Sequence, residues 1–140
     1  MNGASCVNEH RRYAVLIGVS EYEEGVGNLP YARNDVVRLR SVLQTIPAFS
    51  SDRIYLLATG VDPGGNIPVV PPTRANILHR LKYVCDEAGP DDLIFIYFAG
   101  HGTELSETPY LLTADTKMDV LKDTAVTTVR LNFLDVDLTH

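Results

Sequence analysis

Six consecutive apolar or aromatic residues at positions 93–98, Leu-Ile-Phe-Ile-Tyr-Phe, constrain the fold of this chain more than any other feature. A run this short, preceded by the turn sequence Gly-Pro-Asp-Asp at 89–92, is typical of a β-strand that is buried on both faces. Such strands occur in parallel sheets that helices cover on both sides. We therefore expect an α/β fold built around this strand.

A histidine follows this strand almost at once, between two glycines in the sequence Ala-Gly-His-Gly at 99–102. Ligands of open α/β sheets bind beyond the carboxyl ends of the strands, and an imidazole there is a common general acid or base. The alternative is that His101 only closes a turn by hydrogen-bonding to its neighbours. Because Gly-His-Gly is short, it does not decide between the two.

Four further elements are expected before that strand. Buried strands are predicted at 13–19 and 53–58, and a helix between them begins near Pro30 and ends before Pro47. A second helix, at 74–88, follows the N-cap residue Thr73 and ends at Gly89. The predicted apolar faces are Val36, Leu39, Val42, Leu43 and Ile46 in the first helix, and Ile77, Leu78, Leu81, Val84 and Cys85 in the second.

The alternation of strands and helices predicts a parallel sheet with right-handed crossovers. The glycine- and proline-rich segment 60–72 is expected to be a surface loop. After His101 we expect a loop at 103–109, a short strand at 110–112 and a turn at 113–116. Residues 123–134 fit a helix or a strand, and we favour the helix. Residues 1–12 are a predicted flexible lead-in, and 13–140 form one domain.

Composition excludes several classes of function. The 140 residues carry a net charge of −6 without a cluster of Lys or Arg, which argues against nucleic-acid binding. No apolar run is long enough to span a membrane. The two cysteines, Cys6 and Cys85, are too few for a disulfide scaffold, so a reducing cytoplasm is expected. Cys85 falls on the apolar face of its helix, where a small buried hydrophobe is the ordinary interpretation.

Five segments, in this order, resemble the caspase-like cysteine peptidases, most closely the metacaspases and their bacterial relatives. They are YAVLIGV at 13–19, LPYARND at 29–35, PTRANI at 72–77, DDLIFIYFAGHG at 91–102 and YLL at 110–112. Together they cover most of residues 13–116. The resemblance implies a caspase-like sandwich, a mostly parallel sheet flanked by helices, that is partial because the later strands are missing.

The resemblance also implies roles for individual residues. His101 matches the catalytic histidine of a Cys/His endopeptidase, and Gly102 matches the glycine whose backbone N–H helps to hold the oxyanion. Asp35 matches the acid at the base of the S1 pocket in the metacaspase branch, where a buried carboxylate pairs with a substrate Arg or Lys. Without the resemblance, Asp35 is a helix first-turn carboxylate. Ala32 and Ala99 match substrate-pocket positions where relatives often carry Cys and Ser.

The nucleophilic cysteine of the family has no match, because by the family's pattern it would come after His140. Three explanations remain open: a C-terminal remainder carries the cysteine, a second subunit carries it, or the chain is an inactive pseudo-peptidase that serves as an interaction module. A sheet without its next strand exposes an unpaired edge. We therefore expect residues 13–116 to need further protein beside them, and the substrate to be a protein.

A metal site is not expected from the histidines and cysteines, whose spacing matches no ligand motif. Relatives on the metacaspase branch are often activated by calcium. The acids Glu21, Glu23 and Glu24, or Asp115, Asp119 and Asp123, could supply oxygen ligands. Ordinary solvated acids are the alternative, because neither run has the spacing of a recognised calcium loop. No other cofactor is implied.

Overall fold

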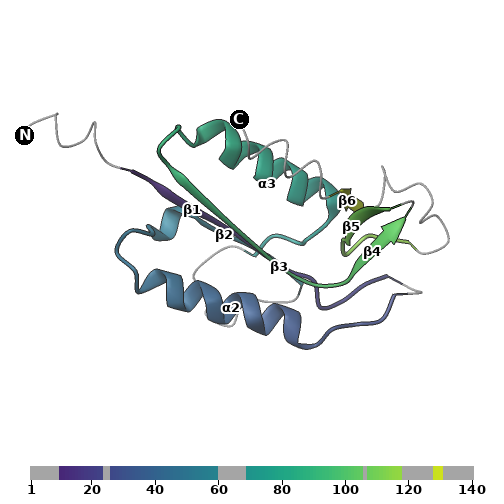
Figure 1. Ribbon diagram of the computed structural model, residues 1–140. Coiled ribbons are helices and arrows are strands. Elements are labelled where there is room, and N and C mark those ends of the chain that lie inside the picture. Colours follow the sequence, from purple (N-terminus) through teal and green to yellow (C-terminus); the bar gives the residue numbers. More distant parts are fainter. Residues whose placement is uncertain (1–9, 24–25, 60–68, 106, 118–127, 131–140) are drawn as a thin grey trace, which may run out of the picture.

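The computed structural model describes residues 10–23, 26–59, 69–105, 107–117 and 128–130 (Figure 1). Its central sheet holds three parallel strands in the order β2-β1-β3. The strands are β1 (Arg12–Gly18), β2 (Ile54–Ala58) and β3 (Leu93–Ala99). The predicted partial α/β fold with a parallel sheet is therefore confirmed.

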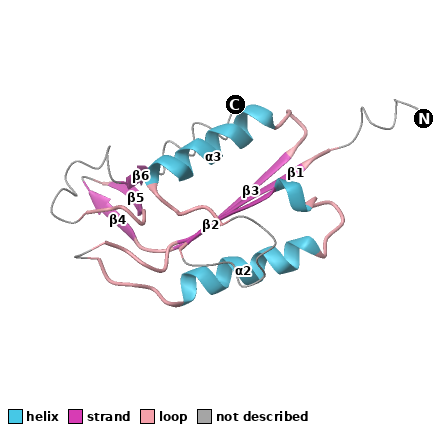
Figure 2. Cartoon of the chain, turned by 180° about the vertical axis from the view of Figure 1, so that it is seen from behind, coloured by secondary structure: helices cyan, strands magenta, loops and turns pink. Residues whose placement is uncertain are grey.

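One helix covers each face of this sheet. Helix α2 (Tyr31–Gln44) lies on one side and α3 (Arg74–Glu87) on the other (Figures 1 and 2). Strand β1 is buried between them, and its residues alternate between the two layers: Tyr13, Val15 and Ile17 pack with α3, whereas Ala14 and Leu16 pack with α2. This period of two is the side-chain alternation of an extended strand.

The apolar face of the first helix differs from the prediction at two positions. Val36 and Leu43 are buried, but Val42 is 56% exposed and Ile46, beyond the end of α2, is 39% exposed. The helix rests on the sheet through a narrower stripe that begins at Ala32, so an apolar residue outside this stripe faces away from the sheet. In α3, Ile77, Leu81 and Val84 are buried, while Leu78 and Cys85 are half-buried.

Strand β3 is less buried than its composition predicts. Its residues are half-buried, and Leu93 is 45% exposed. The physical reason is position: β1 pairs with one side of β3, and within the described residues no strand of this sheet pairs with the other side. The prediction that the strand at 93–98 is buried on both faces is therefore wrong within the described residues.

A second, antiparallel sheet follows His101, in the order β4-β5-β6. Its strands are β4 (Gly102–Leu105), β5 (Thr108–Leu112) and β6 (Thr128–Arg130). The loop expected at 103–109 is thus a hairpin, and Glu107 at its tip has a positive φ of 66°. The helix favoured for 123–134 is wrong at 128–130, because these residues pair with the edge of β5. The rest of that segment lies outside the described residues.

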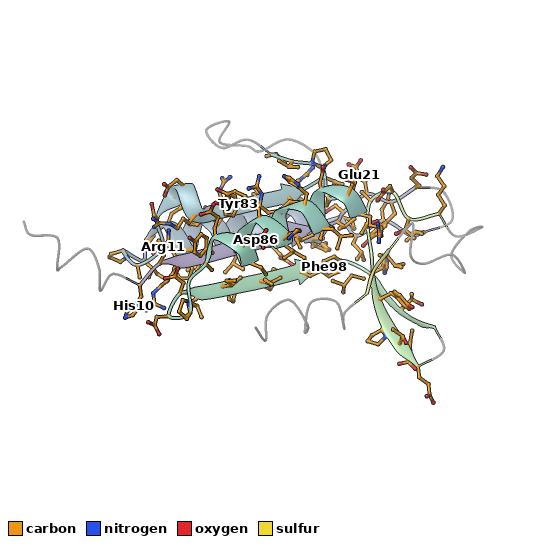
Figure 3. The ribbon with its side chains drawn as sticks, turned by 90° about the horizontal axis from the view of Figure 1, so that it is seen from above. His10, Arg11, Glu21, Tyr83, Asp86 and Phe98 are labelled. Carbon is orange, nitrogen blue, oxygen red and sulfur yellow. The ribbon has the colours of Figure 1, made fainter. Side chains whose placement is uncertain are left out.

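The turn before β3 is held by one carboxylate. Asp92 accepts the backbone N–H groups of Gly89 (2.8 Å) and Arg11 (2.7 Å), and the Arg11 guanidinium lies 3.3 Å from the same carboxylate. The Gly89 hydrogen bond and then the Arg11 hydrogen bond lower the pKa of Asp92. Arg11 lies in the predicted lead-in, and Figure 3 shows it at the opposite end of the sheet from Glu21.

Candidate functional site

His101 lies just beyond the carboxyl end of β3, as its position in the sequence predicts. The carboxyl ends of β1 and β3 are adjacent there, since Val19 N–H donates to the carbonyl of Ala99 over 2.9 Å. The His101 side chain is partly exposed at this edge. A group placed there can reach a ligand that lies beyond the sheet.

The imidazole of His101 is oriented by the loop between β1 and α2. Its Nε2 lies 2.8 Å from the carbonyl oxygen of Gly27. A carbonyl can only accept a hydrogen bond, so Nε2 carries the proton in this contact and Nδ1 is the basic nitrogen. Tyr22, in the same loop, has its ring centroid 5.1 Å from that of the imidazole. The contact thus fixes which nitrogen can take up a proton.

Gly102 begins the hairpin with its amide turned outward. It pairs with Leu111, and the neighbouring hydrogen bond runs from Leu112 N–H to the carbonyl of His101 over 2.9 Å. This pattern makes Gly102 and Leu111 a non-hydrogen-bonded pair, in which both N–H groups point away from the partner strand. A Cβ at Gly102 would meet its nearest atom at 3.4 Å, so packing alone does not require glycine. The amide is therefore directed toward space outside the hairpin.

Ser20 is a buried residue of this region that sequence analysis missed. Its backbone N–H donates to Thr59 Oγ1 (2.9 Å), its carbonyl accepts from Leu29 N–H (2.8 Å), and its Oγ accepts from Arg33 N–H (2.8 Å). Ser20 is 5% exposed. These three bonds tie the loop to the end of β2 and the first turn of α2. No local pattern signals this role, because the three partners are distant in sequence.

The predicted pocket residues lie on two elements. Ala99 ends β3, whereas Ala32 and Asp35 lie near the start of α2. Ala32 is buried against β1, and a Cβ at Gly18 would come within 2.7 Å of its carbonyl oxygen. Asp35 is exposed, in contrast to the buried carboxylate that the resemblance implies. It lies on the flank of α2, one residue before the inward-facing Val36.

Cys85, the one cysteine among the described residues, is not near His101. Cys85 lies near the end of α3, which leads directly into the amino end of β3. His101 lies beyond the opposite end of that strand, and a strand of this length separates its two ends by roughly 20 Å. Cys6 lies outside the described residues.

The acidic residues considered for calcium are only partly described. Glu23 lies 4.0 Å from Lys117, and Asp115 accepts the backbone N–H of Arg74 at the start of α3 over 2.9 Å. Glu24, Asp119 and Asp123 lie outside the described residues. In the part of the chain that is described, no three His, Cys, Asp or Glu side chains are grouped as metal ligands.

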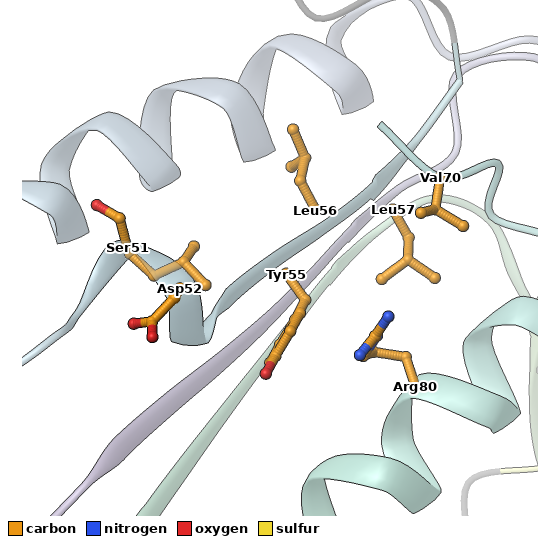
Figure 4. Close-up of a pocket in the computed structure, with 8 residues that line it drawn as sticks. Ser51, Asp52, Tyr55, Leu56, Leu57, Val70 and Arg80 are labelled. Carbon is orange, nitrogen blue, oxygen red and sulfur yellow. The ribbon is translucent and has the colours of Figure 1, made fainter. Parts of the chain in front are cut away.

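A cavity of about 260 Å³ lies on the other side of the molecule, beside β2 (Figure 4). The Arg80 guanidinium at its rim stacks on Tyr55, 4.4 Å from the ring centroid. Since β1 separates β2 from β3, this cavity is remote from His101. Its lining comprises Ser51, Asp52, Ile54, Tyr55, Leu56, Leu57, Val70 and Arg80.

Comparison with known sequences decides the family. A family model described as "Metacaspase, peptidase C14 domain" matches residues 12–129, from the first residue of β1 into β6. The chain belongs to the metacaspase family. The resemblance inferred from the five segments is thereby confirmed, and with it membership of a family of caspase-like cysteine peptidases.

Individual metacaspases match over much of the chain. Metacaspase-1 of Sclerotinia sclerotiorum is 31% identical over 97 residues, which are 69% of this chain and 21% of that protein. Metacaspase-1A of Aspergillus terreus is 32% identical over 101 residues, 72% of this chain and 23% of that protein. The chain thus spans less than a quarter of the length of these two relatives. None of its described helices is long and apolar enough to cross a membrane.

Proposed function

We propose that this chain supplies the catalytic histidine and an oxyanion donor to a cysteine endopeptidase. The observation that carries the proposal is the contact between His101 Nε2 and the Gly27 carbonyl, which leaves Nδ1 to act as the base. Nδ1 would take the proton of a cysteine thiol and later give it to the leaving amine. The outward amide of Gly102 would donate to the oxyanion that forms when the thiolate attacks.

The thiol in this proposal comes from a C-terminal remainder or a second subunit. Cys85 is excluded by its position near the amino end of β3. The outer side of β3 supports the proposal, because this strand lies at the edge of the described sheet and its apolar residues are only half-buried. A further strand paired with this edge would cover them. A neighbouring parallel strand would bring its own carboxyl end beside His101. A thiol nucleophile also fits a reducing compartment, and we propose the cytoplasm.

We propose further that cleavage follows Arg or Lys in a protein substrate. Asp35 supports this specificity, because an exposed carboxylate near the start of α2 is available for a charge-assisted hydrogen bond with a guanidinium or ammonium group. Ala32 and Ala99 have small side chains and would leave room for a long basic one. The segment that covers β3 would bury this ion pair and strengthen it.

A second candidate is a non-catalytic interaction module with the same fold. The specific observation in its favour is that no cysteine of the described residues lies near His101. The outer edge of β3 would then bind a partner strand without any chemistry.

The first test is to read the coding sequence beyond His140 for a cysteine at the end of a buried strand. The protein including that segment is then assayed with peptides that carry Arg, Lys or Asp at P1, with and without calcium. We expect cleavage after Arg and Lys only. His101→Ala should lower kcat/KM by about 1000-fold or more.

Asp35→Ala should lower kcat/KM for Arg and Lys peptides by roughly 10- to 100-fold while leaving the fold intact. Asp86→Ala, which removes an exposed carboxylate from α3, is the matched control and should leave cleavage unchanged. Absence of both a downstream cysteine and turnover would favour the interaction module. Cleavage after Asp would contradict the proposed specificity.

A further inference from the structure

The side chain of Tyr22 contacts His101 in two ways. Its hydroxyl oxygen accepts the backbone N–H of His101 over 2.6 Å, and its ring is tilted by 49° against the imidazole. One residue therefore contacts both the backbone and the side chain of His101. The two are 79 positions apart in sequence.

Gly100 makes this approach possible. A Cβ at Gly100 would lie 2.6 Å from the Tyr22 hydroxyl and 2.7 Å from Cζ of Phe98. Both distances are shorter than real contacts of a methyl group, so a methyl group at Gly100 would push aside the Tyr22 hydroxyl and the end of the Phe98 ring. The packing around Gly100 therefore favours glycine, whereas the packing around Gly102 does not require it.

Tyr22 is itself fixed in place. Its backbone N–H donates to Asn28 Oδ1 over 3.0 Å, which closes the loop that also presents the Gly27 carbonyl to the imidazole. Burial raises the pKa of Tyr22, and the hydrogen bond from His101 N–H offsets part of this rise. The phenol is therefore neutral at neutral pH, with its oxygen as the acceptor.

We propose that Tyr22 is the positioning residue of His101, holding the peptide before it through the hydroxyl and the imidazole through the ring. The peptide after His101 is held separately, by Leu112 N–H on the His101 carbonyl. Both peptide planes around His101 are then fixed, and so is the direction of the Gly102 amide. The catalytic part of this inference rests on the proposed peptidase function, whereas the positioning part does not.

The test uses Tyr22→Phe, which removes the hydroxyl and keeps the ring. In the folded protein, hydrogen exchange of the His101 amide should become about tenfold faster, because the amide loses its acceptor. The ¹⁵N shifts of the imidazole should still show the Nε2–H tautomer. Tyr22→Leu, which removes the ring as well, should in addition reduce the population of that tautomer.

Tyr31→Phe is the matched control, since Tyr31 is 73% exposed at the start of α2. It should change neither the exchange rate nor the tautomer. In the peptidase assay, Tyr22→Phe should lower kcat by about tenfold with KM unchanged, as expected for a group that acts on the geometry of the base.

Two results are distinguishable. If His101 amide exchange in Tyr22→Phe and the tautomer population in Tyr22→Leu both equal those of the parent protein, the positioning role is overturned, whatever the activity. If they change as expected while the parent protein cleaves no peptide, the positioning role stands and the proposed peptidase function fails.

Discussion

The two ends of β3 are fastened by different chemistry. At the amino end, the charged carboxylate of Asp92 gathers the N–H groups of Gly89 and Arg11. At the carboxyl end, His101 is held by neutral groups: the Tyr22 hydroxyl, the Gly27 carbonyl and Leu112 N–H. The first arrangement depends on pH and on one side chain, whereas the second depends on how three separate segments pack.

The difference separates an end of β3 that stabilises the fold from the end that carries the candidate site. At the amino end a single carboxylate joins the local turn to a distant segment, since Asp92 accepts from Gly89, three positions away, and from Arg11, 81 positions away. The carboxyl end is built from a loop more than 70 positions away, and it is there that the candidate site lies. Substitutions matched between the two ends can break or sharpen this contrast.

The largest effect is expected from alanine at Gly100. Its Cβ would collide with Tyr22 and Phe98, so we expect a loss of about 2 kcal/mol in the free energy of unfolding. Gly89→Ala at the other end is the matched control, because its Cβ would meet only Asp92 Oδ2, at 3.6 Å. Chemical denaturation of both variants measures the difference. Equal stabilities would contradict the tight packing proposed at the carboxyl end.

Asp92→Asn should cost about 1 kcal/mol at neutral pH, because an amide has only one oxygen with which to accept the bonds now shared by two. The pKa of Asp92 is lowered in the folded chain, so its contribution is present above the ordinary carboxylate pKa of about 3.9. That contribution is lost as the pH falls through the folded-state value. Denaturation midpoints of parent and variant should therefore converge in acid.

The control for this titration is Asp86→Asn. Asp86 pairs with Lys82 over 3.0 Å on the exposed surface of α3, and such pairs contribute little. Its stability should stay within about 0.5 kcal/mol of the parent protein. A gap between parent and Asp92→Asn that persists below pH 3 would show that something other than charge holds the amino end.

A smaller effect is expected at the start of α3. Thr73 Oγ1 accepts the N–H of Asn76 over 3.3 Å, which is a long N-cap bond. Thr73→Ala should cost about 0.5 kcal/mol, and Thr73→Ser should restore most of it. Thermal unfolding measures the stability of both variants. A loss above about 2 kcal/mol would exceed the contribution of an N-cap and would imply that Thr73 also stabilises the carboxyl end of the central sheet.

The smallest effect is expected from Lys117→Ala. The ion pair of Lys117 with Glu23 spans 4.0 Å between exposed side chains, so its removal should change stability by less than about 0.3 kcal/mol. Salt should not widen this difference. A larger, salt-sensitive loss would mean that charge, and not only Tyr22 and its neighbours, holds the loop over His101.

The elements of the central sheet were predictable because their signals are local. The apolar run of β3 and the N-cap of α3 each carry a pattern within a few residues. The turn predicted at 113–116 is likewise local, and it is confirmed by the hydrogen bond from Thr116 N–H to the Thr113 carbonyl. The hairpin after His101 was missed, since the sequence that forms β4 is polar and has no strong alternation. Only its pairing with β5 makes it a strand.

The site was predictable in outline only. His101 was located by its place after a buried strand, but its partners were not. Tyr22, Gly27 and Ser20 lie in a loop whose glycines and acids indicate only that it is a loop. Their contacts arise from the folded path of the chain, which no spacing in the sequence records.

The pairing of Gly102 with Leu111 limits how the hairpin can vary. Because hydrogen-bonded and non-hydrogen-bonded positions alternate along antiparallel strands, a slip of one residue would turn the Gly102 amide into the ladder with β5. The turn between β4 and β5, in which Glu107 has a positive φ, sets this register. Lengthening the tip by a single residue would thus occupy the amide from the far end of the hairpin, and it would also turn the side chains of β4 to the opposite face.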